Sequence, residues 1–150
     1  MTTPLDQILH HQRILVTGNR SSEIIDACCK VLDHYHRHYD LVSSKKTRIG
    51  VGPIAIIEAS DDLIAYDPHI ALIDEVSDSN KSMYETLASS MPKSGTLVYN
   101  ELNKTAKEIC SEERKDVHLE AYASGDVQDA AMALLKRVGI SEESFKSVLN

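Results

Sequence analysis

The sequence is poor in aromatic residues and in cysteine. Its 150 residues include no tryptophan, one phenylalanine and three cysteines. So few aromatic rings leave little surface on which nucleobases or sugars could stack. Cys28 and Cys29 are neighbours and Cys110 is distant, so the cysteines form no disulfide framework. This pattern favours a reducing compartment, and we expect a cytoplasmic location.

Basic residues are in the minority. The chain has 16 lysines and arginines against 23 aspartates and glutamates, which gives a formal net charge of −7, and the basic residues are scattered. A protein that binds a phosphate backbone gathers Lys and Arg on one surface. We therefore expect no nucleic-acid partner.

Long apolar runs are missing as well. The longest one, Val51–Ile57, is interrupted by Gly52 and Pro53. Residues 1–11 contain no apolar segment of the kind found in secretion signals. We therefore expect no membrane association.

The chain does have enough apolar material for one core. Hydrophobic residues make up 42% and charged residues 26%. A chain of this length buries roughly 68–70% of its unfolded surface, so it can form a core without disulfides or metals. We predict an N-terminal extension over residues 1–12 and a single domain over residues 13–150.

Short apolar runs alternate with stripes of helical periodicity. The predicted strands are Arg13–Thr17, Asp40–Ser43, Ile49–Val51, Ile54–Ile57, Ile70–Ile73, Thr96–Tyr99 and Val117–Tyr122. The predicted helices begin at Ser22 and Ser141 and span Lys81–Met91, Asn103–Cys110 and Val127–Val138. This alternation indicates a three-layer α/β fold, in which a mostly parallel sheet has helices on both faces. The last of these strands alternates in polarity, which is typical of an edge strand.

In such sheets, ligands bind at the carboxyl ends of the strands. The residues at those ends are Thr17-Gly18, Ser43, Glu58, Asp74 and Asn100. A ligand site is expected among them.

Four short sequence segments near these strand ends resemble a known protein family. They are Val16-Thr17-Gly18, Ile56-Ile57-Glu58, Pro68–Ile73 and Lys93–Asn100. In this order they resemble the ATP-binding central domain of the Mur ligases. The segments Asp67–Ile73 and Pro92–Glu101 are most similar to the muropeptide-recycling branch of that family, the UDP-N-acetylmuramate:tripeptide ligases. The resemblance covers roughly Arg13–Leu149.

The resemblance implies a relative of ATP-dependent, amide-bond-forming ligases of peptidoglycan synthesis. Such ligases use ATP to make an acyl phosphate on a UDP-muramoyl peptide, which an amine then attacks. In the family, two neighbouring domains bind the UDP-sugar and complete the nucleotide and amine sites. The resemblance extends to neither of these domains in this chain.

The phosphate-binding loop departs from the family's pattern. The family has a Gly-Thr-Asn/His-Gly-Lys-Thr type of loop, and this chain reads Gly18-Asn19-Arg20-Ser21-Ser22. The resemblance puts Arg20 at the second glycine, where a positive φ is expected, Ser21 at the phosphate-binding lysine, and Ser22 at the metal-binding hydroxyl. A serine hydroxyl cannot replace the lost ammonium group. Two interpretations stay open: the loop holds a phosphate through Arg20 and helix amides, or it is an ordinary turn capped by Ser21 or Ser22.

Two other strand-end residues match functional positions of the family. The resemblance makes Glu58 a Mg²⁺ ligand and places Asn100 near the adenine base. Their simpler interpretations are a solvated acid and a turn-forming asparagine. The candidate nucleotide-binding residues are Gly18, Asn19, Arg20, Ser21, Ser22 and Asn100, and the candidate metal ligand is Glu58. His34 and His38 also have the i, i+4 spacing of a metal pair, but a solvated helix end is the preferred interpretation for them.

The lost residues decide the catalytic question. Removing one preorganised charge from a phosphoryl-transfer site slows the reaction by about 10²–10³-fold. The loop lysine, its glycine and a histidine after Ile70–Ile73 are all missing. We predict a non-catalytic binding or scaffold module with no catalytic residue, no firm cofactor and an unidentified protein partner.

Two alternatives to this prediction stay open. In the first, the chain is a ligase remnant or a nucleotide-dependent switch that binds Mg-ATP weakly through Arg20, Ser22, Glu58 and Asn100. In the second, it is an unrelated α/β domain whose likeness to the ligases arose by convergence.

Overall fold

A seven-stranded sheet forms the middle layer of the computed structural model, which describes residues 12–43, 47–49, 52–58, 68–74, 76–113, 116–123 and 126–149. The strand order is β3-β2-β4-β1-β5-β6-β7, and each neighbouring pair is parallel except β2 and β3. The strands are β1 (Gln12–Val16), β2 (Tyr39–Val42), β3 (Thr47–Arg48), β4 (Ile54–Glu58), β5 (Ile70–Ile73), β6 (Thr96–Asn100) and β7 (His118–Tyr122). The strand that leads into the candidate loop, β1, lies at the centre of the sheet.

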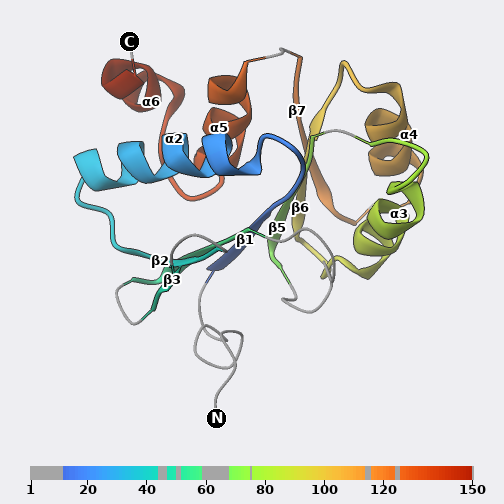
Figure 1. Cartoon of the computed structure of the whole chain (residues 1–150), viewed down its shortest axis with the longest axis horizontal. Helices are drawn as coiled ribbons and strands as arrows, with labels where there is room; N and C mark the ends of the chain where they lie inside the picture. The colour runs from blue at the N-terminus through green and yellow to red at the C-terminus, as the bar shows by residue number, and fades with distance from the viewer. Residues whose placement is uncertain are drawn as a thin grey trace.

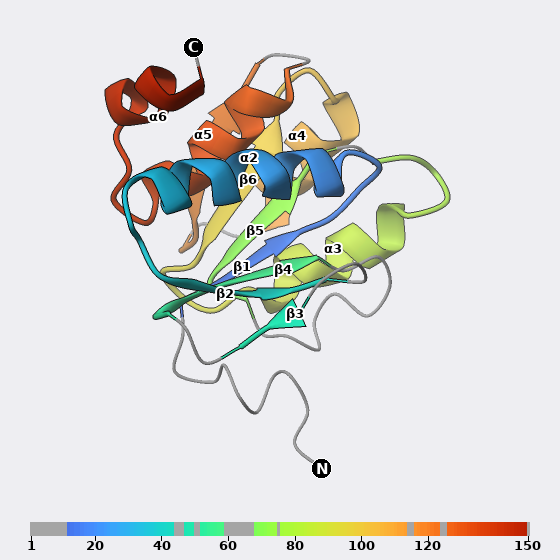
Figure 2. The ribbon, with the colours of Figure 1, turned by 60° about the vertical axis from the view of Figure 1, so that its left-hand side comes forward.

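Five described helices cover both faces of this sheet. They are α2 (Ser21–His34), α3 (Lys81–Ser90), α4 (Lys104–Glu113), α5 (Val127–Lys136) and α6 (Glu142–Leu149). Helices α2, α5 and α6 lie on one face and α3 and α4 on the other (Figures 1 and 2). The predicted three-layer α/β fold with a mostly parallel sheet is confirmed.

Successive residues of the central strand enter two different cores. Ile14 and Val16 pack with α2, α5 and α6, whereas Leu15 packs with α3 and α4. All three side chains are fully buried. Burial on both faces explains why the central strands are continuous apolar runs.

The first helix, α2, differs from its prediction at both ends. Its N-cap residue is Arg20, which makes no side-chain cap hydrogen bond, and the helix begins at Ser21. The predicted serine cap is therefore wrong. At the other end α2 stops at His34, and His36 has a left-handed φ of 55°. His34 and His38 therefore do not share a helix face, and the described residues contain no group of three or more His, Cys, Asp or Glu that could hold a metal.

One strand of the structure was not predicted, and one predicted strand is contradicted at its first residue. The short strand β3 lies at Thr47–Arg48, antiparallel to β2, whereas Ile49 belongs to no strand and residues 50 and 51 lie outside the described ones. An exposed threonine and a half-buried arginine give no apolar signal, whereas Ile49–Val51 contains two apolar residues and resembles a strand in sequence. Residues 1–11 also lie outside the described ones, so the extension over residues 1–12 stays a prediction.

Two other helix ends lie close to their predicted positions. Asn103 caps α4, because its Oδ1 accepts a hydrogen bond of 2.9 Å from the N–H of Ala106, although α4 continues beyond Cys110 to Glu113. Helix α5 ends at Lys136, two residues before the predicted end at Val138, and Gly139 lies in the turn that follows with a φ of 93°. Within the described part of the chain, no helix is long and apolar enough to cross a membrane.

Candidate functional site

The chain leaves β1 and β5 toward opposite faces of the sheet. The helix after β1 is α2, and the helix after β5 is α3 on the other face. Loops that diverge in this way open a crevice at the carboxyl ends of the two strands, where ligands of open α/β sheets bind. A cavity of about 350 Å³ lies there. It is lined by Gly18, Asn19, Val76, Ser77, Asn80, Asn100, Leu102 and Asn103.

Thr17 fixes the position of the β1–α2 loop, residues 17–20. Its buried hydroxyl donates to the carbonyl oxygen of Leu72 at 3.1 Å and shares a hydrogen bond of 2.8 Å with the Tyr84 hydroxyl. Gly18 has a φ of 100°, which only glycine adopts without strain. Arg20 has a φ of −103°, so the positive φ expected at Arg20 is wrong.

Arg20 forms an ion pair with Asp74 at the end of β5. Its Nε donates to Oδ2 at 2.9 Å and its Nη2 donates to Oδ1 at 2.7 Å. The Asp74 side chain has no exposed surface, and that of Arg20 is 19% exposed. This two-bond geometry is the arrangement in which Arg binds a carboxylate most strongly.

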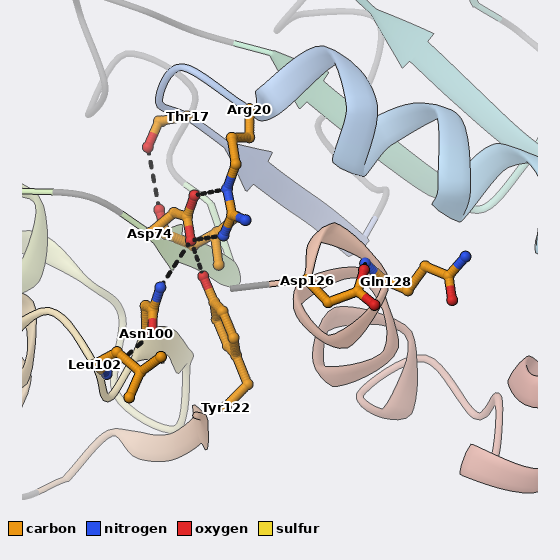
Figure 3. A network of polar contacts seen from close by, with 9 residues as sticks. Thr17, Arg20, Asp74, Asn100, Leu102, Tyr122, Asp126 and Gln128 are labelled. Carbon is orange, nitrogen blue, oxygen red and sulfur yellow. Dashed lines mark hydrogen bonds and ion pairs between the residues drawn. The ribbon is translucent and has the colours of Figure 1, made fainter. Parts of the chain in front are cut away.

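Two more side chains converge on the same carboxylate (Figure 3). The buried hydroxyl of Tyr122, at the end of β7, donates to Asp74 Oδ1. Asn100 lies at the end of β6, and its Nδ2 donates to the same oxygen of Asp74 at 3.5 Å. The Oδ1 of Asn100 accepts a hydrogen bond of 3.0 Å from the N–H of Leu102. The Asp74 network, comprising Arg20, Asp74, Asn100 and Tyr122, thus joins the ends of three strands to the β1–α2 loop.

Opposing effects set the pKa of Asp74. Burial on its own raises the pKa of this carboxyl, but hydrogen bonds from Arg20, Tyr122 and Asn100, together with the guanidinium charge, lower it below the ordinary value of 3.8. Burial, and then the hydrogen bond to Asp74, raise the pKa of Tyr122. At neutral pH the network therefore contains an ionised carboxylate and a neutral phenol.

A second contact links the start of α2 to the end of β4. Ser21 Oγ donates to Glu58 Oε2 at 2.8 Å, and both residues are half-buried. Ser22, also half-buried, lies in the same first turn of α2. The structure thus brings the candidate residues together in two groups, with Arg20 and Asn100 at Asp74, and Ser21 at Glu58.

The residues of this loop do not fit a magnesium-bound triphosphate. Between Thr17 and Ser22 the sole basic residue is Arg20, and its guanidinium binds a buried carboxylate. The resemblance puts Ser21 at the phosphate-binding lysine, and the Ser21 hydroxyl donates to Glu58. The groups that the resemblance assigns to phosphate and metal therefore bind to neighbouring side chains.

The sequence placed Asp74 among the strand ends but not among the candidate binding residues, and Tyr122 was missed. Asp74 directly follows a fully apolar strand, and that position was the available signal. Tyr122 gave no signal, because it was assigned to the polar face of an edge strand. The structure reverses that assignment, since Tyr122 is buried and Ala121 is exposed.

Comparison with solved structures gives the fold of this chain. It is similar to the UDP-N-acetylmuramoylalanyl-D-glutamyl-2,6-diaminopimelate–D-alanyl-D-alanyl ligase of Acinetobacter baumannii, with a TM-score of 0.74 and 12% identity over 96% of this chain. It is also similar to the UDP-N-acetylmuramate:L-alanyl-gamma-D-glutamyl-meso-diaminopimelate ligase of Neisseria meningitides, with a TM-score of 0.71 and 12% identity over 94% of this chain. A third similar structure is the folylpolyglutamate synthetase of Lactobacillus casei, with a TM-score of 0.60 and 11% identity over 99% of this chain.

These matches confirm the predicted Mur ligase resemblance at the level of the fold. The chain spans 47%, 66% and 64% of the three matched chains, in the order given. No protein-family model and no curated protein sequence matches it. What the three proteins catalyse therefore bears on this chain only as a proposal.

Proposed function

We propose that this chain is a non-catalytic binding or scaffold module built on the fold of the Mur ligase central domain. The observation that carries the proposal is the ion pair between Arg20 and Asp74. In this pair the one cation of the loop, Arg20, binds a carboxylate of the chain itself. Ser21 and Glu58, to which the resemblance assigns phosphate and Mg²⁺ binding, form a hydrogen bond with each other. A cytoplasmic location is part of the proposal and is supported by the free cysteines of the described chain.

A nucleotide that recruits Arg20 has to compete with Asp74. Breaking a buried ion pair costs about 3–5 kcal/mol, because the remaining charge stays buried without its partner. At 1.4 kcal/mol for each factor of ten, this weakens nucleotide binding by roughly two to three and a half powers of ten. The net charge of −7 repels a polyphosphate further. We expect an ATP dissociation constant in the millimolar range or above.

The alternative function is weak Mg-nucleotide binding by a ligase remnant related to peptidoglycan precursor synthesis. The cavity beside Gly18 favours it, because its volume of about 350 Å³ falls within the range of small-molecule sites. Its wall contains Asn100 and Leu102, whose 64% exposed side chain supplies an apolar surface. In this alternative the contacting residues are Arg20, Ser22, Glu58 and Asn100.

Calorimetric titration of the full chain with Mg-ATP separates the two proposals. The binding module predicts weak binding or none, whereas a micromolar dissociation constant would favour the nucleotide-binding alternative. A variant in which Thr-His-Gly-Lys replaces Asn19-Arg20-Ser21 serves as the comparison. It regains the ammonium group and the second glycine, so phosphate binding is expected to improve by a few kcal/mol at most.

The same variant tests for hidden catalysis. A muramoyl peptide, an amine and ATP are incubated with it, and phosphate release is measured. We expect no substrate-dependent turnover, because acyl transfer needs both reactants held in position. Substrate-dependent ATP hydrolysis by the repaired chain would overturn the non-catalytic proposal.

A further inference from the structure

The edge strand β7 has no partner strand on its outer side among the described residues. It is last in the strand order and pairs with β6 alone. Figure 1 shows β7 at this end of the sheet, between α5 on one side and α4 on the other. The edge position expected from its alternating sequence is confirmed.

The hydrogen bonds to β6 determine which backbone groups of β7 point inward. The N–H of His118 donates to the carbonyl oxygen of Gly95, and the N–H of Glu101 donates to that of Tyr122. Along a parallel strand, alternate residues direct both backbone groups to the same neighbour. His118, Glu120 and Tyr122 therefore face β6 with their backbone groups.

Leu119 and Ala121 direct their backbone groups away from the sheet. Two N–H and two C=O groups thus form a row along the outer edge, which is a template for an added strand. Edge strands are commonly protected by lysine or proline, and β7 contains neither. Ala121 is exposed and small, so its side chain leaves room for a neighbouring strand.

A groove of about 260 Å³ lies beside this edge, between β7, α5 and the start of α6. Met132 and Ala133 of α5 form an apolar part of its wall, next to Ala121 and Ala123 at the end of β7. A strand added to β7 would direct alternate side chains toward this side of the sheet.

The groove is acidic. Its charged lining residues are Glu120, Asp129 and Glu142 against Lys136, a net charge of −2. Lys136 Nζ lies 3.7 Å from Glu120. Lys146, outside the lining, lies 2.8 Å from Glu142 in an exposed pair. With Lys146 counted, the local net charge is −1, which a basic side chain in the groove would complement.

We propose that the β7 edge and this groove bind an extended peptide segment of a partner protein, which adds to the sheet as a further strand and directs Lys or Arg side chains into the groove. The proposal deepens the proposed binding role and rests on it. A second copy of this chain fits less well, because pairing two β7 edges brings Glu120 and the other groove acids of both copies together. A basic partner avoids this repulsion.

The probe is the peptide acetyl-Val-Lys-Val-Lys-Val-Lys-amide, titrated into the ¹⁵N-labelled full chain at low salt. We expect the largest amide shifts at Leu119 and Ala121. The matching peptide with glutamate in place of lysine is expected to bind at least tenfold more weakly. Shifts centred away from β7, or equal binding of the two peptides, would overturn the proposal.

N-methylated peptides distinguish strand addition from attraction between charges. An added strand turns every second amide toward β7, so methylation of one alternate set should weaken binding about tenfold or more, while methylation of the other set changes it less than twofold. Equal effects of the two methylated peptides would show that no strand is added. This comparison needs no change in the protein.

Two charge variants complete the experiment. E120Q removes a groove charge and is expected to weaken peptide binding about threefold or more, whereas E108Q removes a charge from an exposed residue of α4 and should change it less than twofold. Equal effects would indicate non-specific attraction, and dimerisation that E120Q strengthens would favour a second copy as the occupant. Both of these results count against the proposal.

The nucleotide titration reports separately on the proposed function. If the chain binds Mg-ATP with a micromolar dissociation constant and still binds the peptide, the proposal of weak or absent nucleotide binding is overturned. The β7 site is then unaffected. If the chain binds neither the peptide nor ATP, the proposed β7 site is overturned and the non-catalytic proposal is unaffected.

Discussion

Replacing Arg20 with alanine tests whether the ion pair with Asp74 is a structural element. The variant R20A removes two charge-assisted hydrogen bonds from a carboxylate that has no exposed surface. Breaking a buried pair costs about 3–5 kcal/mol, and we expect about 3 kcal/mol here, because the space left by the 19% exposed arginine admits water. For a chain of this size the melting temperature should fall by about 6–12 °C.

The pH dependence of this loss has a defined sign. The folded-state pKa of Asp74 lies below 3.8, so its contribution to stability is fully present above that pH and is lost as the pH falls through the folded-state pKa. In R20A burial dominates, the pKa of Asp74 rises above 3.8, and the ionised carboxylate destabilises the fold at neutral pH. The stability difference between wild type and R20A should therefore be smaller at pH 4 than at pH 7.

Urea unfolding followed by circular dichroism at the two pH values measures both effects. The double variant R20A/D74N should recover part of the stability lost in R20A, because no unpaired charge then remains buried. Lys146→Ala is the control, since it breaks an exposed ion pair and should leave the unfolding midpoint unchanged. A loss below about 1 kcal/mol in R20A that is equal at pH 4 and pH 7 would refute the structural role of the pair.

Three further substitutions have expected effects that thermal or urea unfolding can measure. Gly18→Ala should cost about 1 kcal/mol from its φ of 100° alone, since the nearest atom to an added Cβ is Asp74 Cβ at 4.0 Å; no loss would mean that the loop adopts another conformation. Tyr122→Phe removes a donor to Asp74 and should cost about 1–3 kcal/mol, with acid unfolding shifted to higher pH; an unchanged acid midpoint would contradict this. Phe145→Ala should cost about 3–5 kcal/mol, because this 2% exposed ring anchors α6 in the core; a loss below 1 kcal/mol would show that α6 is not anchored there.

The sequence predicted elements wherever burial leaves a periodic or continuous apolar signal. Ile70–Ile73 was predicted with the observed bounds because both faces of β5 are buried. The two-residue strand β3 was not predicted, because Thr47 and Arg48 belong to neither apolar core. Local patterns therefore report burial and not strand pairing as such.

The positions of the candidate residues could be predicted, but their partners could not. Parallel topology brings strand ends to one edge, so Arg20 and Asn100 were expected near each other. Which acid binds Arg20 depends on a contact across 54 positions of sequence, and several acids were available at that edge. Tyr122 reaches the same carboxylate from β7, a placement that depends on the whole sheet order and leaves no local trace.

In the proposed function, the ion pair between Arg20 and Asp74 links the stability of this fold to its ligand preference. A parallel sheet gathers charged strand ends at one edge, and a buried carboxylate such as Asp74 needs a positive partner from a ligand or from the chain. Because Arg20 supplies that partner, the charge of Asp74 is balanced within the chain, and a polyphosphate that drew Arg20 away would lose the free energy that the pair contributes. In the proposed function, the same contact both stabilises the domain and weakens nucleotide binding. If the edge that binds phosphate in the ligases is internally paired here, as we propose, a surface elsewhere is the better place for recognition, and the proposed β7 site is such a surface.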